Sequence, residues 1–286
     1  NMTISIAVLG ASGVYGRHLL PRLIARGHNV RALVRSPHTA HAARASGADI
    51  VAADIFAEDG LAKALDGCDL AINLATALGN TNAGVDYALN DRVRREGVPI
   101  FLRACVEAGI TRVIQQSIAL THSAGEDWAD ENDGPPRSAD PISAAAIDAA
   151  CAIKEMVARA PLDWVTLSGG LFYGPGTGFD DDWFARAAAG KLRLPGDGAD
   201  YVSLIHIADM AEATCAAIDR WPSRQELIIA DDAPARWRHP PPGTSPRSRR
   251  WTASWTTWQP MPAAPPASPS APWPWRGRSA ASRPAA

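Results

Sequence analysis

Three glycines at fixed spacing, Gly10, Gly13 and Gly16, constrain the fold of this chain more than any other feature. They follow the apolar run 4–9 and open the helix-like stretch 17–26. In a parallel α/β sheet, this order suits a buried strand that turns sharply into a helix whose N-terminus holds a pyrophosphate. A plain tight turn is the alternative. Because strand, glycines and helix come in the required order, the sequence predicts a dinucleotide-binding site.

A second apolar run, 30–34, ends at Arg35, about twenty residues beyond the glycine loop. Sites that prefer NAD usually have Asp or Glu at this point, whereas Arg accommodates the 2′-phosphate of NADP. The guanidinium fork can hold a phosphate through paired hydrogen bonds. A solvated arginine at a strand end is the alternative. We therefore predict NADP(H) as the cofactor, with NAD(H) as the second possibility.

The composition limits the classes of partner. A net charge of −2 over 286 residues predicts binding to neither nucleic acid nor a membrane surface. There is no run of 18 apolar residues and no signal-like N-terminus. The four cysteines are scattered without a CxxC pair, which argues against a zinc site or a disulfide framework. We expect a reduced, cytoplasmic protein with a small-molecule substrate.

The composition changes abruptly near residue 238. Residues 238–286 contain no Asp, Glu, Lys, Leu, Ile or Val, yet hold 12 of the 23 prolines and five of the ten tryptophans. Such a stretch has no strand or helix period and cannot build a core of its own. A Pro-rich linker or ligand is one interpretation. Out-of-frame translation of GC-rich DNA is the one we favour, so we expect the organised domain to span 1–237.

Apolar runs and helix-like segments alternate along the first half of the chain. This alternation predicts a doubly wound parallel sheet of the Rossmann type, with helices on both faces. The predicted strands are 3–9, 29–35, 49–54, 70–76 and 112–117, and the predicted helices are 14–26, 38–46, 58–66, 86–108 and 142–160.

Cofactors in such sheets bind beyond the carboxyl ends of the strands, so the residues at those ends matter most. They are Gly10, Arg35, Asp54, Ala75 and Ser117. Asp54 could accept a hydrogen bond from an adenine amino group or could cap the next helix. The small residues at the end of the fourth strand would let a flat ring or a ribose pass close to the backbone.

Lys154 lies on an otherwise small and apolar face of the helix predicted for 142–160. Ile147, Ala150 and Cys151 share that face at helical spacing. The lysine either extends to solvent or points into the cofactor crevice.

These residues resemble the atypical and extended short-chain dehydrogenase/reductases, the NAD(P)-dependent epimerase/dehydratase-like and NmrA-like proteins. The resemblance runs from about residue 3 to 236. It rests on motifs in family order at 10–16, 34–35, 54, 112–117, 154–155, 172–176 and 205–210. It implies a substrate-binding subregion at about 170–237, with the segment 179–200 near the substrate. The dinucleotide contacts that it implies are Gly10, Ser12, Gly13, Val14, Tyr15, Gly16, Arg35, Asp54, Ile55, Ala75, Thr76, Lys154, Gly169 and Gly170.

The chain departs from this family at its proton donor. In the family, a Ser at the end of the fifth strand polarises the substrate, and a Tyr four residues before the Lys transfers the proton. The Lys binds the nicotinamide ribose and lowers the pKa of the Tyr. Ser117 and Lys154 match two of these positions, but Ala150 occupies the third. No tyrosine lies within 142–160, so the standard family mechanism is absent.

Several functions remain compatible with that departure. The protein could be a reductase that takes its proton from His122, Tyr173 or solvent. It could reduce a flavin, quinone or conjugated alkene that needs little protonic help. It could instead bind NADP(H) without turnover, as a redox sensor or partner protein. Epimerase or dehydratase activity is a further alternative. We favour the reductase, and we expect that a homodimer could form through 86–108 and 142–160.

Overall fold

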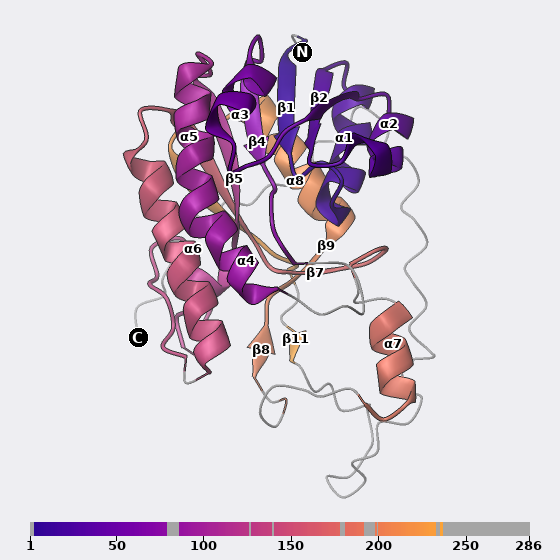
Figure 1. Ribbon diagram of the computed structural model, residues 1–286. Coiled ribbons are helices and arrows are strands. Elements are labelled where there is room, and N and C mark those ends of the chain that lie inside the picture. Colours follow the sequence, from indigo (N-terminus) through magenta and orange to yellow (C-terminus); the bar gives the residue numbers. More distant parts are fainter. Residues whose placement is uncertain are drawn as a thin grey trace, which may run out of the picture. The chain divides into compact units, whose positions relative to one another are not determined.

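The computed structural model describes residues 3–78, 86–125, 127–138, 140–177, 181–191, 198, 200–232 and 235–236. Seven strands form one sheet in the order β10-β6-β5-β4-β1-β2-β3, and every neighbouring pair is parallel (Figure 1). The predicted tail 238–286 and much of the segment 179–200 lie outside the described residues. The strands are β1 (Ser5–Leu9), β2 (Asn29–Val34), β3 (Asp49–Ala52), β4 (Leu70–Asn73), β5 (Arg112–Ile118), β6 (Asp163–Gly169) and β10 (Gln225–Ile229).

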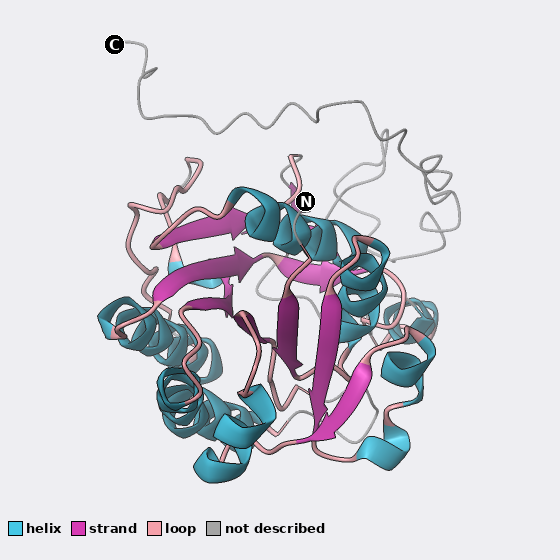
Figure 2. Ribbon diagram, turned by 90° about the horizontal axis from the view of Figure 1, so that it is seen from above, coloured by secondary structure: helices cyan, strands magenta, loops and turns pink. Residues whose placement is uncertain are grey.

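Helices cover both faces of this sheet, as Figure 2 shows from above. One hydrophobic cluster joins the sheet to α1 (Val14–Ala25), α2 (His41–Ala45) and α8 (Ile207–Arg220). The other joins it to α3 (Glu58–Leu65), α5 (Val98–Glu107) and α6 (Pro141–Arg159). The predicted Rossmann-type doubly wound sheet is therefore confirmed.

Strand β1 shows why a run of apolar residues is needed here. Ile6 and Val8 belong to the cluster under α1 and α8, whereas Ala7 and Leu9 belong to the cluster under α3 and α5. Successive side chains of a strand point to opposite faces, so a strand covered on both faces must be apolar at every position.

The prediction of a helix over 86–108 is wrong in one respect, because the observed helix is not continuous. It divides into α4 (Tyr87–Arg92), a π-helical turn η2 (Val93–Gly97) and α5. Pro99, in the first turn of α5, lacks an N–H group, and its ring clashes with the carbonyl four residues earlier in a regular helix. The wider turn precedes this position, and such turns are frequent at functional sites.

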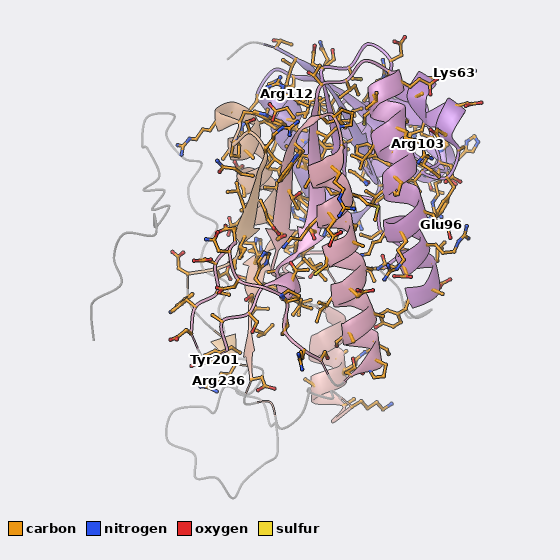
Figure 3. All side chains as sticks on the ribbon, turned by 90° about the vertical axis from the view of Figure 1, so that its left-hand side faces the viewer. Lys63, Glu96, Arg103, Arg112, Tyr201 and Arg236 are labelled. Carbon is orange, nitrogen blue, oxygen red and sulfur yellow. The ribbon has the colours of Figure 1, made fainter. Side chains whose placement is uncertain are left out.

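An ion pair on the outer surface joins two of the helices. Two ion-paired residues, Glu58 and Arg103, join α3 to α5 at 2.7 Å on the outer surface, where Figure 3 labels Arg103. No helix among the described residues is both long and apolar enough to cross a membrane.

The remaining elements are η1 (Pro37–Thr39), η3 (Ala119–Thr121), α7 (Asp181–Ala188), and two small sheets that pair β7 (Leu171–Tyr173) with β9 (Leu204–His206) and β8 (Tyr201–Val202) with β11 (Ala235–Arg236).

Candidate functional site

The glycine loop lies where the strand order reverses, between β1 and β4. Gly10 has φ +79°, and a Cβ atom there would lie 2.7 Å from the backbone nitrogen of Ala75. A Cβ atom on Gly16 would lie 2.2 Å from the carbonyl oxygen of Ala11. Gly10 thus permits the turn and the close approach of the β4 end, and Gly16 permits α1 to pack on the loop.

The N-terminus of α1 offers the features that a pyrophosphate requires. Gly13 is the N-cap residue, and its N–H donates to the carbonyl oxygen of Gly10 at 3.0 Å. No side chain caps the helix, and its first turn carries no acidic residue. Ser12 is exposed and Val14 is half-buried beside this end. The first N–H groups of α1 can therefore receive an anion, so the loop fits the dinucleotide that the sequence predicts.

Tyr15 contributes to the core through its side chain. It is 5% exposed, and its hydroxyl pairs with Thr214 Oγ1 at 2.5 Å on α8. Its ring packs edge-on against Phe172 with centroids 5.5 Å apart. Burial raises the pKa of Tyr15 far above its usual range. Only the backbone of Tyr15 is left for a cofactor contact.

The two neighbouring strand ends carry polar side chains at the surface. Arg35 is exposed directly after β2. Asp54 is exposed as well, and its Oδ1 accepts from the Phe56 N–H at 3.0 Å. Asp54 therefore closes a local turn and does not cap α3, whose N-cap residue is Ala57. Ile55 is buried in the core under α5.

Close packing explains why glycine occupies positions 169 and 170. A Cβ atom on Gly169 would lie 2.9 Å from the ring of Phe172, and one on Gly170 would lie 2.8 Å from the carbonyl oxygen of Ser203. Both are buried at the carboxyl end of β6.

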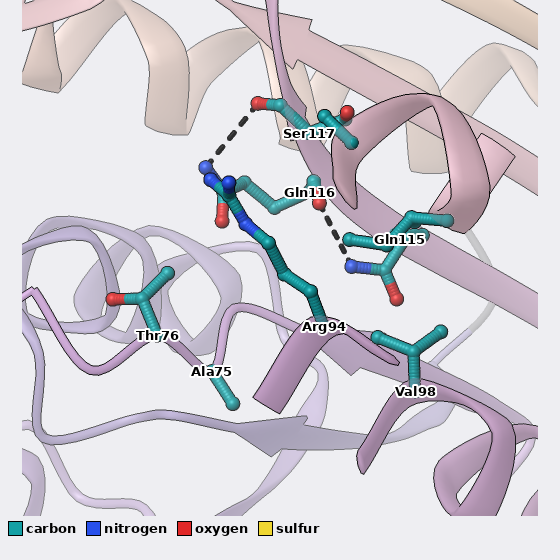
Figure 4. Close-up of a pocket in the computed structure, with 9 residues that line it drawn as sticks. Ala75, Thr76, Arg94, Val98, Gln115, Gln116 and Ser117 are labelled. Carbon is teal, nitrogen blue, oxygen red and sulfur yellow. Dashed lines mark hydrogen bonds between the residues drawn. The ribbon is translucent and has the colours of Figure 1, made fainter. Parts of the chain in front are cut away.

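A pocket opens at the carboxyl ends of β4 and β5, beneath α6 (Figure 4). Ser117 lies in it, 4% exposed, and its Oγ has no hydrogen-bond partner among the described residues. Ala150 faces the same pocket and is 1% exposed. The lining residues are Ala75, Thr76, Arg94, Val98, Gln115, Gln116, Ser117, Ala150 and Ile153.

The sheet beneath α6 carries a row of polar side chains that crosses four strands, buried on β4, β5 and β6 and half-buried on β10. Asn73, Gln115, Thr166 and Glu226 are successive partners in the registers of β4, β5, β6 and β10. Asn73 Nδ2 donates to Gln115 Oε1 at 3.0 Å. Buried polar groups normally have hydrogen-bond partners, and Thr166 Oγ1 has none among the described residues, so this row marks a specialised part of the sheet.

The structure brings together two residues that the sequence predicts separately, Lys154 and His122. Lys154 Nζ lies 2.9 Å from His122 Nε2. His122 is buried, with 7% of its surface exposed. Both face Glu226, at 2.8 Å from Lys154 Nζ and 3.4 Å from His122 Nε2.

Glu226 is a residue that the sequence analysis missed. Its Oε1 also accepts from Ser168 Oγ at 2.5 Å. Burial raises the pKa of Glu226, but hydrogen bonds from His122, Lys154 and Ser168 lower it by more, so the net pKa falls below its usual value. Glu226 follows Gln225 in a short strand near the composition change, and nothing in its local pattern distinguishes it from a surface carboxylate.

Tyr173 lies on β7, outside the seven-stranded sheet. Its ring packs edge-on against His206 with centroids 5.1 Å apart. Burial and a hydrogen bond to Asp231 raise the pKa of Tyr173 to about 12. This ring contact and this hydrogen bond involve neither Ser117 nor His122 nor Lys154. No group of His, Cys, Asp and Glu in the described part of the chain could hold a metal ion.

Comparison with known proteins agrees with this geometry. A model of the NAD dependent epimerase/dehydratase family matches residues 6–230. A 3-diazoavenalumate denitrifying reductase from Streptomyces sp is 34% identical over 80% of this chain and 77% of its own length. A 4-hydroxy-2-methyl-3-oxo-4-farnesyl-3,4-dihydroquinoline-1-oxide ketoreductase from Stigmatella aurantiaca is 28% identical over 81% and 69%.

Solved structures agree on the fold. The UDP-glucose 4-epimerase of Thermus thermophilus, in complex with NAD, has a TM-score of 0.64 and 21% identity. The match covers 82% of this chain and 80% of that one.

Proposed function

The chain belongs to the NAD dependent epimerase/dehydratase family, and we propose that it is an NADP(H)-dependent reductase of a small carbonyl, quinone, flavin or conjugated acceptor. The observation that carries the proposal is the cluster of Lys154, His122 and Glu226, in which His122 is buried and the other two residues are half-buried. Lys154 lies one residue along α6 from Ile153, which lines the pocket that contains Ser117. The names of the two relatives above, a reductase and a ketoreductase, support the same class of reaction.

The glycine loop and the N-terminus of α1 would hold the pyrophosphate, and the end of β4 at Ala75 and Thr76 would border the ring. When bound, the reduced nicotinamide supplies two electrons for the reduction. Arg35 supports NADP(H) over NAD(H), because its guanidinium stands exposed at the end of β2, where the 2′-phosphate is recognised in such folds.

The proton must come from a group other than residue 150, because the methyl of Ala150 neither gives nor takes one. The Ser117 hydroxyl is available to donate a hydrogen bond to a substrate oxygen, since no protein group among the described residues occupies it. His122 Nε2 and Lys154 Nζ lie 2.9 Å apart, and the Glu226 carboxylate lies 2.8 Å from Lys154 Nζ and 3.4 Å from His122 Nε2. His122 or solvent would supply the proton that the substrate oxygen takes up, and the Glu226 carboxylate keeps His122 and Lys154 in place.

The test is a calorimetric titration of the purified protein with NADPH and, separately, with NADH, followed by an absorbance assay of NADPH oxidation with quinone, flavin, carbonyl and enone acceptors. We expect tighter binding of NADPH and turnover with at least one acceptor class. Lys154→Met should lower the rate, whereas Lys63→Met, on the outer helix α3, should not. Binding of neither cofactor would overturn the proposal.

A second candidate, a redox sensor that binds NADP(H) without turnover, is favoured by one observation, the buried Ala150 at the position of the family's proton donor. Stoichiometric binding with no oxidation by any acceptor would select it. The same alanine argues against epimerase or dehydratase chemistry, which depends on proton transfer at that position in the family.

A further inference from the structure

Arg94 is a buried cation that has no paired carboxylate among the described residues. It is 9% exposed, and its described hydrogen bond runs from Nη1 to the carbonyl oxygen of Ala146 at 3.2 Å. The nearby acid, Asp91, is already paired with Arg95 at 3.1 Å. Burial lowers the pKa of Arg94, and the charge of Asp91 offsets this only in part.

The guanidinium of Arg94 lines the pocket together with Ser117 (Figure 4). Figure 4 shows its side chain extending across the pocket towards Gln116 and Ser117. The π-helical turn η2 carries Arg94, so an irregular backbone places this cation. The Ser117 Oγ is a second polar group that is buried without a partner among the described residues. The Arg94 guanidinium, whose described hydrogen bond uses only Nη1, and the Ser117 hydroxyl therefore line the same pocket, where Ala150 contributes only a methyl group.

We propose that Arg94 and Ser117 form a recognition site for an anionic oxygen group, a carboxylate or a comparable oxyanion, on the organic substrate. This deepens the proposed function and rests on it, because it assigns a chemical class to the substrate of the same pocket. A buried charge is costly until it is paired, and a guanidinium fork matches the two oxygens of a carboxylate. An anionic ligand would supply the charge that the protein does not.

The role of Arg94 differs from that of an acid. A guanidinium stays protonated at any physiological pH, so it can bind and orient a negative oxygen but cannot transfer a proton to it. Arg94 therefore determines specificity, and the proton remains the task of another group.

The experiment is equilibrium calorimetry of the NADP⁺-loaded protein with two probes of the same shape, trans-cinnamate and the neutral cinnamamide. We expect cinnamate to bind roughly tenfold or more tightly than cinnamamide, as charge-assisted hydrogen bonds predict. Arg94→Gln should abolish that preference and leave NADP⁺ affinity unchanged. The matched control is Arg95→Gln, one residue further along the same turn, which should keep the preference. Circular dichroism confirms folding of each variant.

If Arg94→Gln does not fold, Arg94→Lys replaces it in the experiment. Lysine keeps the positive charge but lacks the two-pronged guanidinium group, so the Arg94→Lys variant should retain only part of the preference for cinnamate. Equal affinity of the wild-type protein for both probes overturns the inference, as does a preference that survives in Arg94→Gln. A loss of NADP⁺ affinity in Arg94→Gln would instead make Arg94 a cofactor contact, and this also overturns it. Failure of the wild-type protein to bind NADP⁺ overturns the proposed function, and the probes titrated against the free protein then decide the anion site by itself.

Discussion

Replacing Glu226 by Gln is the sharpest test of the buried cluster. The substitution keeps the shape of the side chain and removes its charge. Lys154 and the imidazole of His122 would then face a neutral amide, although the Lys154 and Glu226 side chains are only 24% and 13% exposed. A cation left in such a place without its counter-ion destabilises the folded state.

The expected loss of stability depends on how deeply the ion pair is buried. Removal of one partner from a fully buried ion pair costs about 3–5 kcal/mol. This pair keeps some contact with solvent, and glutamine preserves a hydrogen bond, so we expect a loss of about 2 kcal/mol in the free energy of unfolding. For a domain of this size, that corresponds to a fall in Tm of about 4–8 °C. A double-mutant cycle with Lys154→Met should give a coupling energy of about 1–2 kcal/mol.

The pH dependence gives an independent signature. The pKa of Glu226 is lower in the folded state, so its contribution to stability is present above its unfolded pKa and is lost as the pH falls through the folded value. The difference in Tm between wild type and Glu226→Gln should be full at pH 7 and shrink below about pH 4.3. The control Glu96→Gln removes an exposed partner of Arg92 and should leave Tm unchanged. Equal Tm values for wild type and Glu226→Gln at pH 7, or a difference that persists unchanged in acid, would refute the reasoning.

Three further substitutions test other parts of the molecule. Arg35→Asp should weaken NADPH binding by about tenfold or more and favour NADH in calorimetry, because it replaces the phosphate-binding fork with an acceptor for a ribose hydroxyl; unchanged preference would remove Arg35 from the cofactor site. Gly16→Ala should cost about 1–3 kcal/mol in urea unfolding, because its Cβ would lie 2.2 Å from a backbone oxygen; wild-type stability would show that α1 can shift freely. Tyr15→Phe should cost about 1 kcal/mol through loss of the bond to Thr214, and a neutral result would show that water replaces it.

Much of the fold follows from the sequence because its signals are local. The glycine loop, the two-sided apolar strands and the amphipathic helices are each contained in a short stretch of chain, and the helix predicted for 142–160 is α6 (Pro141–Arg159). The break in the helix predicted for 86–108 does not follow from the sequence, because a π-helical turn leaves no distinct period over five residues.

The candidate site can be predicted only in part, for a physical reason. Ser117 and Lys154 lie at positions that a strand end and a helix face can indicate. Glu226 and Arg94 depend on contacts across strands and helices that are far apart in the chain, 72 residues in the case of Lys154 and Glu226. In a sequence, charged residues of this kind resemble surface residues until the fold shows what lies opposite them.

The edge position of β10 has a consequence for how the protein is made. This strand is the last of the seven in the chain, and it brings the carboxylate that neutralises Lys154. Until residue 226 has been added to the chain, α6 holds its lysine without this counter-charge. The final strand therefore completes the sheet and supplies the counter-charge of Lys154 together, so a chain stopped before residue 225 would lack that carboxylate at the sheet edge.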